Sequence, residues 1–173
     1  MKQKINAFDY AGDICKALPG GVLLTTKANG QVNTMTIGWG HIGIEWGRPI
    51  FVAYVRKSRH TYKMLEENGE FTVNVPLGNV DKKILGFCGR TSGRDTNKIE
   101  ALGLTLEDGN SVSVPGIKEL PLTLECKVIY KQEQDLCAVQ PCLLERYYPA
   151  DDNGVRDVHV AYYGEILDAY LIK

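Results

Sequence analysis

The sequence predicts a mainly β fold with a few short helices, in which the strands form a closed or half-closed barrel. Three observations lead to this fold class. About seven segments have the apolar patterns typical of strands, and the helical segments between them are short. The pair Asn29-Gly30, a strong hairpin signal, separates the first two strand segments. No repeat or linker interrupts the chain, so residues 1–173 are expected to form a single domain.

The composition is that of an ordinary globular protein, with 44% hydrophobic and 24% charged residues. A small barrel can bind nucleic acid, but this requires a basic groove with interleaved aromatic residues. The net charge of −1 argues against nucleic acid and against anionic lipid as partners. The sequence contains no apolar run long enough to cross a membrane, and no secretory signal follows Met1. We therefore expect a cytoplasmic protein.

The cysteines and histidines form no recognisable metal or disulfide pattern. The five cysteines include no Cys-x-x-Cys pair, and the three histidines are scattered. We expect the thiols to act as small core hydrophobes in a reducing compartment. These residues are Cys15, Cys88, Cys126, Cys137, Cys142, His41, His60 and His159.

The first part of the chain predicts a helix and then an antiparallel hairpin. Tyr10, Ile14 and Leu18 recur at about one-turn spacing, and Pro19 ends that pattern. A later run is apolar on both faces up to Arg56, which indicates a strand buried on both sides. In order, we predict a helix over 7–18, strands over 21–26 and 31–39, a connection over 41–48 and a strand over 50–56.

The stretch from Asn33 to Gly40 is the most informative of these segments. Alternate residues of a strand share a face, so Asn33 and Trp39 point to the same side. Gly38 and Gly40 weaken a strand and mark places where a ligand or another backbone comes close. The pattern fits a flat aromatic ligand lying against the strand, and it also fits a core strand with a glycine bulge.

The turn after the strand over 50–56 is basic and rich in hydroxyl groups. Ser58 is a candidate N-cap of a helix that Gly69 would end. The free N–H groups and the dipole of a first helical turn attract anions, and Arg59, His60 and Thr61 add charge and a hydroxyl group. This composition suits a phosphate, although the signature of a nucleotide loop is absent. The alternative is a capped helix with solvated arginines.

The remaining segments continue the β-rich pattern, with Pro141 placing the segment around it at a sheet edge or a bulge. In order, we predict a strand over 70–76, a helix capped by Asn79, a polar loop over 89–94, a short helix capped by Asp95, a strand over 122–132, a β segment over 136–148, a loop over 149–154 and a strand over 158–172.

Several isolated residues have both a structural and a functional interpretation. Cys88 is expected to be a buried, inert thiol, with a reactive thiol as the alternative. His159 is expected to be a satisfied structural histidine, with a functional one as the alternative. Asp151, Asp152 and Asp157 are expected to form a solvated face or a loose cation site. No Gly-x-Ser-x-Gly motif indicates serine hydrolysis.

Four motifs in this order make the chain resemble the flavin reductase-like family, whose members have an FMN-binding split β-barrel. The motifs are residues 33–39, 55–62, 70–74 and 89–98. The resemblance extends over nearly the whole chain. It implies a homodimer with one FMN per subunit near the dimer interface.

The resemblance also implies roles for the matching positions. The polar edge of the isoalloxazine ring would be bound by backbone groups of Thr34, Met35, Thr36, Ile37 and Gly38, and the ring would be flanked by Asn33 and Trp39. The phosphate and ribityl chain would be held by Arg56, Ser58, Arg59, His60 and Thr61. The other side would be approached by Cys88 and by the loop that starts at Gly89, together with Lys98. No essential general acid or base is expected, because the flavin itself carries the chemistry.

Three functions follow from this resemblance. The first is an FMN-dependent oxidoreductase in which NADH or NADPH donates hydride and a small molecule or a redox protein accepts the electrons. The second is a flavoredoxin-like electron-transfer protein that binds FMN without oxidising a nicotinamide. The third is an interaction module without flavin, against which the intact turn from Ser58 to Thr61 argues. No Rossmann Gly-x-Gly-x-x-Gly motif is present, so a nicotinamide would have to stack directly on the flavin.

Overall fold

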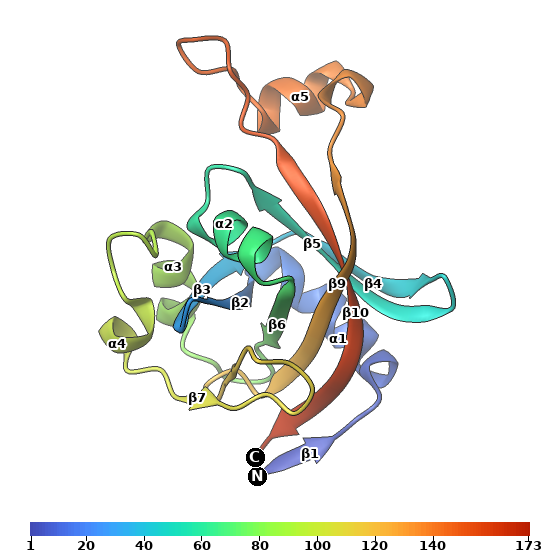
Figure 1. The fold of residues 1–173 in the computed structure, drawn as a ribbon, viewed down its shortest axis with the longest axis vertical. Coiled ribbons are helices and arrows are strands. Elements are labelled where there is room, and N and C mark those ends of the chain that lie inside the picture. The colour runs from blue at the N-terminus through green and yellow to red at the C-terminus, as the bar shows by residue number, and fades with distance from the viewer.

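The protein, as a computed structural model, is described over residues 1–173 and is built around one antiparallel sheet (Figure 1). The strands of this sheet are β1 (Lys2–Lys4), β2 (Val22–Ala28), β3 (Gln31–Ile37), β4 (Gly40–Glu45), β5 (Arg48–Arg56), β6 (Glu70–Val75), β9 (Leu122–Glu133) and β10 (His159–Ile172). A separate small sheet consists of β7 (Leu106–Glu107) and β8 (Gly116–Ile117).

The order of the strands shows why the sheet curls into a barrel. Along the sheet the order is β3-β2-β6-β9-β10-β5-β4, with β1 paired to β10. The two edge strands, β3 and β4, are consecutive in the chain, and only Gly38 and Trp39 separate them. The sheet must therefore bend until its edges lie close together, although β3 and β4 are not paired. This split barrel confirms the predicted mainly β, half-closed fold.

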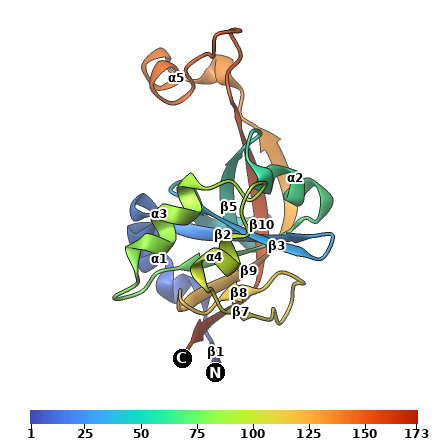
Figure 2. The same cartoon turned by 90° about the vertical axis from the view of Figure 1, so that its left-hand side faces the viewer.

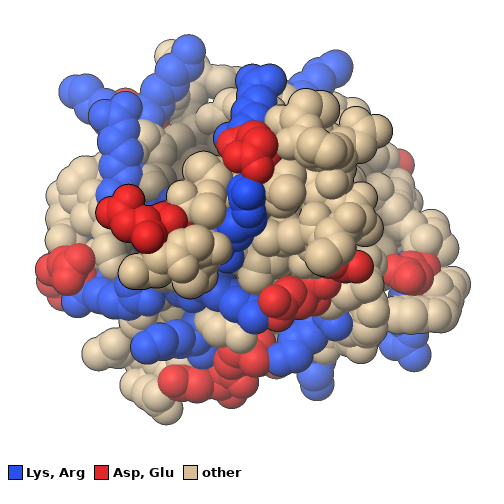
Figure 3. Space-filling view, turned by 90° about the horizontal axis from the view of Figure 1, so that it is seen from above, with Lys and Arg blue, Asp and Glu red and all other residues tan.

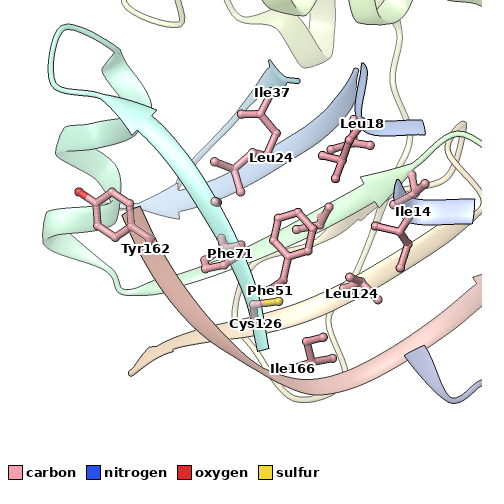
Figure 4. Packing of buried hydrophobic residues seen from close by; sticks show 14 of the residues in the cluster. Ile14, Leu18, Leu24, Ile37, Phe51, Phe71, Leu124, Cys126, Tyr162 and Ile166 are labelled. Atoms are coloured by element: carbon pink, nitrogen blue, oxygen red, sulfur yellow. The ribbon is translucent and has the colours of Figure 1, made fainter. Parts of the chain in front are cut away.

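The interior of the barrel is a continuous apolar core (Figure 4). Phe51 from β5 and Phe71 from β6 are fully buried and face the same interior as Cys126 of β9. Ile14 and Leu18 close one end of this core. The predicted helix over 7–18 is confirmed as η1 (Ala7–Tyr10), α1 (Ala11–Ala17) and η2 (Leu18–Gly20).

Three further helices lie beside the β2–β3 side of the barrel (Figure 2). They are α2 (His60–Glu67), α3 (Lys82–Arg90) and α4 (Lys98–Leu102). The predicted helices are present, but their predicted caps are wrong. Asp81 caps α3 and Asn97 caps α4, each by accepting a bond from a backbone N–H two residues later, whereas Arg59, without a side-chain bond, precedes α2. Each helix begins later in the sequence than its predicted cap implied.

The prediction of a connection over 41–48 is wrong, because this segment contains β4. Residues 40–45 pair with β5 in antiparallel register, and Trp46 and Gly47 make the turn. Both turn residues have positive φ, 50° and 70°, which is typical of a two-residue hairpin. Tryptophan rarely adopts such a backbone conformation, so the hairpin lacks the usual sequence signal.

The prediction of a β segment over 136–148 is also wrong. The segment forms η3 (Leu136–Ala138) and α5 (Pro141–Tyr147). Pro141 occupies the first turn of α5, where a missing N–H costs nothing, and so it starts a helix rather than marking a strand edge. No residue of α5 is buried, and Figure 1 shows the helix standing clear of the barrel at the ends of β9 and β10. We call residues 134–158 the arm.

The cysteines are all free, as expected, but they are not all in the core. Cys88 and Cys126 are buried, whereas Cys15, Cys137 and Cys142 are exposed, two of them on the arm. No side-chain cluster suited to a metal ion is present, and Asp157 is instead hydrogen-bonded to Ser58. None of the helices combines the length and the apolar character that crossing a membrane would demand.

Candidate functional site

Two adjoining cavities lie at the end of β3. The first, which we call the basic cavity, has a volume of about 130 Å³ and is lined by Asn33, Met35, Thr36, Ser58, Arg59, His60, Thr61, Cys88, Gly89, Thr91, Ser92, Gly93, Arg94 and Lys98. The second, the aromatic cavity, has a volume of about 190 Å³ and is lined by Met35, Thr36, Ile37, Gly38, Trp39, Tyr54, Arg56, Arg59 and His159. The two cavities adjoin one another, because Met35, Thr36 and Arg59 line both of them.

The charges of the basic cavity are all of one sign. Arg59, Arg94 and Lys98 line it together with His60, and no aspartate or glutamate does. The pKa of His60 is lowered, first by partial burial and then by the neighbouring Arg94 and Lys98 cations. His60 is therefore neutral at pH 7, and an anion in the cavity would raise its pKa.

Lys98 is the most buried cationic side chain of this cavity, with only 4% of its surface exposed. Its ammonium group donates to the carbonyl oxygens of Cys88 at 3.4 Å and of Thr91 at 3.2 Å. It has no ion-pair partner. Burial lowers its pKa, because the charged form has lost water. Since a buried cation without a counter-charge is unfavourable, the cavity is suited to an anion.

The start of α2 contributes backbone groups to the same cavity. No side chain caps its first turn, so its N–H dipoles face the cavity without competition from a cap. The Thr61 hydroxyl accepts a hydrogen bond from Asn33 Nδ2 at 3.0 Å, which ties α2 to β3. Ser58 is engaged elsewhere, because its hydroxyl donates to Asp157 Oδ2 at 2.6 Å.

The aromatic cavity is walled by side chains from distant parts of the chain. The ring of Trp39 lies 4.9 Å from that of His159 and 5.2 Å from that of Tyr147, measured between centroids. Tyr54 stands at right angles to His159, with centroids 6.5 Å apart. Trp39 is 40% exposed, so one face of the site is open to solvent. Such flat, polarizable walls suit a planar aromatic ligand.

His159 is held in one orientation by the arm. The Tyr148 hydroxyl lies 2.8 Å from His159 Nδ1 and donates to Gln134 Oε1 at 2.5 Å. Because the hydroxyl proton is used on Gln134, its oxygen accepts from Nδ1–H, and Nε2 keeps a free lone pair. Burial, followed by the nearby Arg56 charge, lowers the pKa of His159 to about 4. A neutral imidazole therefore lines the aromatic cavity at physiological pH.

Arg56 connects the cavity to the arm. Its guanidinium group donates to the carbonyl oxygens of Asp157 at 2.6 Å and of Tyr147 at 2.7 Å. It lines the aromatic cavity and not the basic one. Its predicted contact with a phosphate therefore stays a prediction, whereas its role in anchoring the arm is visible in the structure.

The structure brings the predicted site residues together with one exception. Thr34 lines neither cavity, because its hydroxyl points inward and is hydrogen-bonded to Thr25 Oγ1 at 3.0 Å. A ligand contact through its backbone stays a prediction. The loop from Gly89, which was predicted as a whole, lines the basic cavity through Thr91, Ser92, Gly93 and Arg94. The prediction missed Tyr54, and His159 was expected to be structural. The four loop residues adjoin the predicted Gly89, and β-sheet register places His159 opposite Arg56.

The two glycines near the end of β3 have different roles. A methyl group on Gly40 would lie 2.7 Å from Phe51 Cζ and 3.0 Å from the Val52 carbonyl oxygen. Gly40 is therefore required by the close approach of β5. Gly38 lines the aromatic cavity, and a methyl group there would meet only the Leu18 carbonyl oxygen, at 3.5 Å. Gly40 is thus explained by the close approach of β5 without a bulge, because β4 and β5 pair in regular register, whereas Gly38 lines a cavity.

The surface outside these cavities carries both signs of charge. On the face shown in Figure 3, Lys and Arg side chains are interspersed with Asp and Glu side chains. This face offers no continuous basic groove of the kind that tracks a nucleic-acid backbone.

Comparison with known proteins agrees with this geometry. Flavoredoxin of Desulfovibrio vulgaris (Miyazaki F) superposes with a TM-score of 0.67 at 25% identity, covering 87% of this chain and 68% of that one. Flavoredoxin from Methanosarcina acetivorans has a TM-score of 0.64 at 28% identity, covering 87% and 67%. An uncharacterized protein of Archaeoglobus fulgidus is 36% identical over 101 residues, which are 58% of this chain and 56% of that protein.

The match to curated relatives is partial, since the aligned part of this chain spans just over half of their length. The family-level match is more extensive. The sequence model of the flavin reductase like domain matches residues 16–173, which include every residue that lines the two cavities. The half-closed barrel, the solved structures that share it and this match lead to one conclusion: the chain belongs to the flavin reductase-like family.

Proposed function

We propose that the protein is an FMN-binding oxidoreductase, with the phosphate in the basic cavity and the flavin ring in the aromatic cavity. The observation that carries this proposal is the buried, unpaired Lys98 in a cavity lined by Arg59 and Arg94 and by no carboxylate. A phosphate monoester carries about −1.5 to −2 charges at pH 7 and would compensate these cations. The names of the two flavoredoxins and the family support a flavin as the ligand.

Bound FMN would supply a ring that takes up electrons or hydride and passes them on. The residues of the chain would orient this ring. The polar backbone at the end of β3 would bind its edge, Trp39 would provide a flat wall, and the neutral His159 would offer a hydrogen-bond acceptor at Nε2. The arm holds Trp39 and His159 in place through Tyr147 and Tyr148.

We propose NADH or NADPH as the hydride donor, and a small molecule or a redox protein as the acceptor. The open side of the aromatic cavity, next to the half-exposed Trp39, leaves room for a second planar ring to approach. The alternative is an electron-transfer protein that binds FMN and is reduced by another protein. The likeness to two flavoredoxins, at 25% and 28% identity, supports this alternative.

We further propose a homodimer. Ile44 and Trp46, at the tip of the β4–β5 hairpin, are each 63% exposed, and the Trp46 ring contacts Tyr130 of β9 with centroids 5.8 Å apart. Exposed apolar clusters of this kind mark interaction sites. The five free cysteines fit the predicted reducing, cytoplasmic location. Light scattering coupled to size-exclusion chromatography would measure the mass of the assembly.

The experiment that tests the main proposal is a visible spectrum of the purified protein, before and after addition of stoichiometric FMN. NADH and then NADPH are added under anaerobic conditions. Flavin absorbance that bleaches with either donor supports the oxidoreductase. Flavin absorbance that persists favours the electron-transfer alternative. Protein that binds no FMN even after reconstitution contradicts both.

A further inference from the structure

A third cavity lies directly beyond the basic cavity, and we call it the outer cavity. It has a volume of about 570 Å³ and extends along the N-terminal part of α4 toward Leu106. This volume is in the range of cavities that hold small ligands, so a nucleoside could fit. The outer and basic cavities share the lining residues Asn33, His60, Gly93, Arg94 and Lys98. These five residues form the wall between the two cavities.

The wall is tightly packed at Gly93. A methyl group on its Cα would lie 2.1 Å from Asn33 Oδ1 and 3.1 Å from Cδ2 of the His60 ring. Real Cβ atoms do not approach other atoms so closely, so the backbone of Gly93 is in direct contact with both side chains. A ligand that extends from the basic cavity into the outer one must therefore displace this segment.

Gly93 belongs to a segment, residues 91–94, that is hydrogen-bonded to neighbouring parts of the chain on both sides. We call this segment the latch. Arg94 Nη2 donates to the carbonyl oxygen of Ser58 at 2.8 Å, which connects the latch to the turn before α2. The Lys98 ammonium group donates to the Thr91 carbonyl oxygen at 3.2 Å, which connects it to α4. The Arg94 N–H donates to Ser92 Oγ at 3.2 Å and so stiffens the latch itself.

We propose that the latch determines which form of flavin the protein accepts, by admitting a terminal phosphate and excluding a flavin dinucleotide. The inference rests on the proposed function. In FAD the corresponding phosphate carries an adenylate group, and the outer cavity behind the wall is an adjoining space large enough to hold it. That phosphate is also a diester-type group with about one negative charge, so it compensates the cations of the basic cavity less well than a monoester does.

The test measures the dissociation constants of FMN, FAD and riboflavin by quenching of flavin fluorescence. The proteins are the wild type, Arg94→Ala, Gly93→Ala and the control Arg90→Ala. Arg90 is an exposed arginine next to the latch that lines none of the three cavities. We expect the wild type and the control to bind FMN at least about tenfold more tightly than FAD. Both latch variants are expected to reduce this ratio at least about threefold.

The outcomes separate the inference from the proposed function. If none of the three flavins binds to the wild type, the proposed function fails. If the wild type binds FMN and FAD equally, or if Arg94→Ala weakens both in parallel, the latch is not the determinant and the inference is overturned. Arg94 is exposed and lies in a loop, so we expect Arg94→Ala to fold. The test therefore gives a result even if Gly93→Ala does not fold.

Discussion

The two cavities of the site are built in opposite ways. The basic cavity uses short segments, residues 58–61 and 88–98, each of which supplies several lining residues in a row. The aromatic cavity uses single residues, such as Tyr54 and His159, that only the sheet and the arm bring together. An anion site can thus be formed by local backbone and charge, whereas flat walls for a ring require long-range packing.

The difference extends to protonation. The basic cavity holds the cations Arg94 and Lys98 and shares Arg59 with the aromatic cavity, so it requires a counter-ion. The aromatic cavity holds His159, which burial keeps neutral. A change in the charge of a lining residue should therefore alter ligand affinity at the basic cavity and the stability of the folded protein at the aromatic cavity. The predictions below test this contrast, starting with the largest expected effect.

Acid should destabilise the folded protein through His159. Its pKa is about 4 when folded and 6.5 in the absence of the fold, so the unfolded chain binds the extra proton first as the pH falls. The part of the free energy of unfolding that depends on a neutral His159 is therefore fully present above pH 6.5 and is lost as the pH falls toward 4. At about 1.4 kcal/mol per pKa unit, the loss approaches about 3 kcal/mol.

Urea unfolding of the wild type and of His159→Gln between pH 4 and pH 7 would measure this loss. We expect the variant to have the flatter profile. His41→Gln, at an exposed position, is the control and should keep the wild-type profile. Parallel profiles for the wild type and His159→Gln would show that His159 is not the acid-sensitive group.

Lys98→Met should weaken FMN binding by about 30-fold, or about 2 kcal/mol, because it removes the buried cation of the basic cavity. Riboflavin has no phosphate, so its affinity should change little. The free protein should unfold at an equal or higher temperature, since a buried unpaired charge is lost. Lys83→Met, on the exposed side of α3, is the control. An equal loss for FMN and riboflavin would contradict the assignment of the phosphate to this cavity.

Gly40→Ala should destabilise the fold by about 1.5 kcal/mol, because its methyl group would overlap Phe51. Gly38→Ala should cost less than about 0.5 kcal/mol, because its methyl group reaches only ordinary contact distance. Thermal unfolding of the two variants compares them directly. If both variants are equally stable, the close approach of β5 is not what requires the glycine at position 40.

Trp39→Leu should weaken FMN and riboflavin alike, by about fivefold, or about 1 kcal/mol, because both ligands would lose the same aromatic wall. Fluorescence titration with the two ligands measures this. Phe8→Leu, at an exposed aromatic residue that lines none of the three cavities, is the control and should leave both affinities unchanged. A selective loss of FMN binding would place the phosphate, rather than the ring, next to Trp39.

The same difference between the two cavities decides which residues of the site could be predicted from the sequence. The basic turn at 56–61 was found from its composition, because cations, hydroxyl groups and a helix start are adjacent in the sequence. The role of Ser58 was not, since its partner Asp157 lies 99 residues away on the arm. His159 was missed as a cavity-lining residue for the same reason, because none of its neighbours in sequence was predicted to bind the ligand. Tyr54 was also missed, although it shares a strand face with Arg56, two residues later.

The sequence by itself determined the strands β2, β3, β5, β6, β9 and β10 and the first hairpin, because alternation and turn residues act over a few positions. Tertiary structure alone decided that β4 pairs with β5 through a Trp46-Gly47 turn and that Pro141 begins a helix on the arm. It also decided that the sheet edges meet across Gly38 and Trp39. The physical reason is that burial and strand register depend on partners that are distant in the chain, which local patterns do not encode.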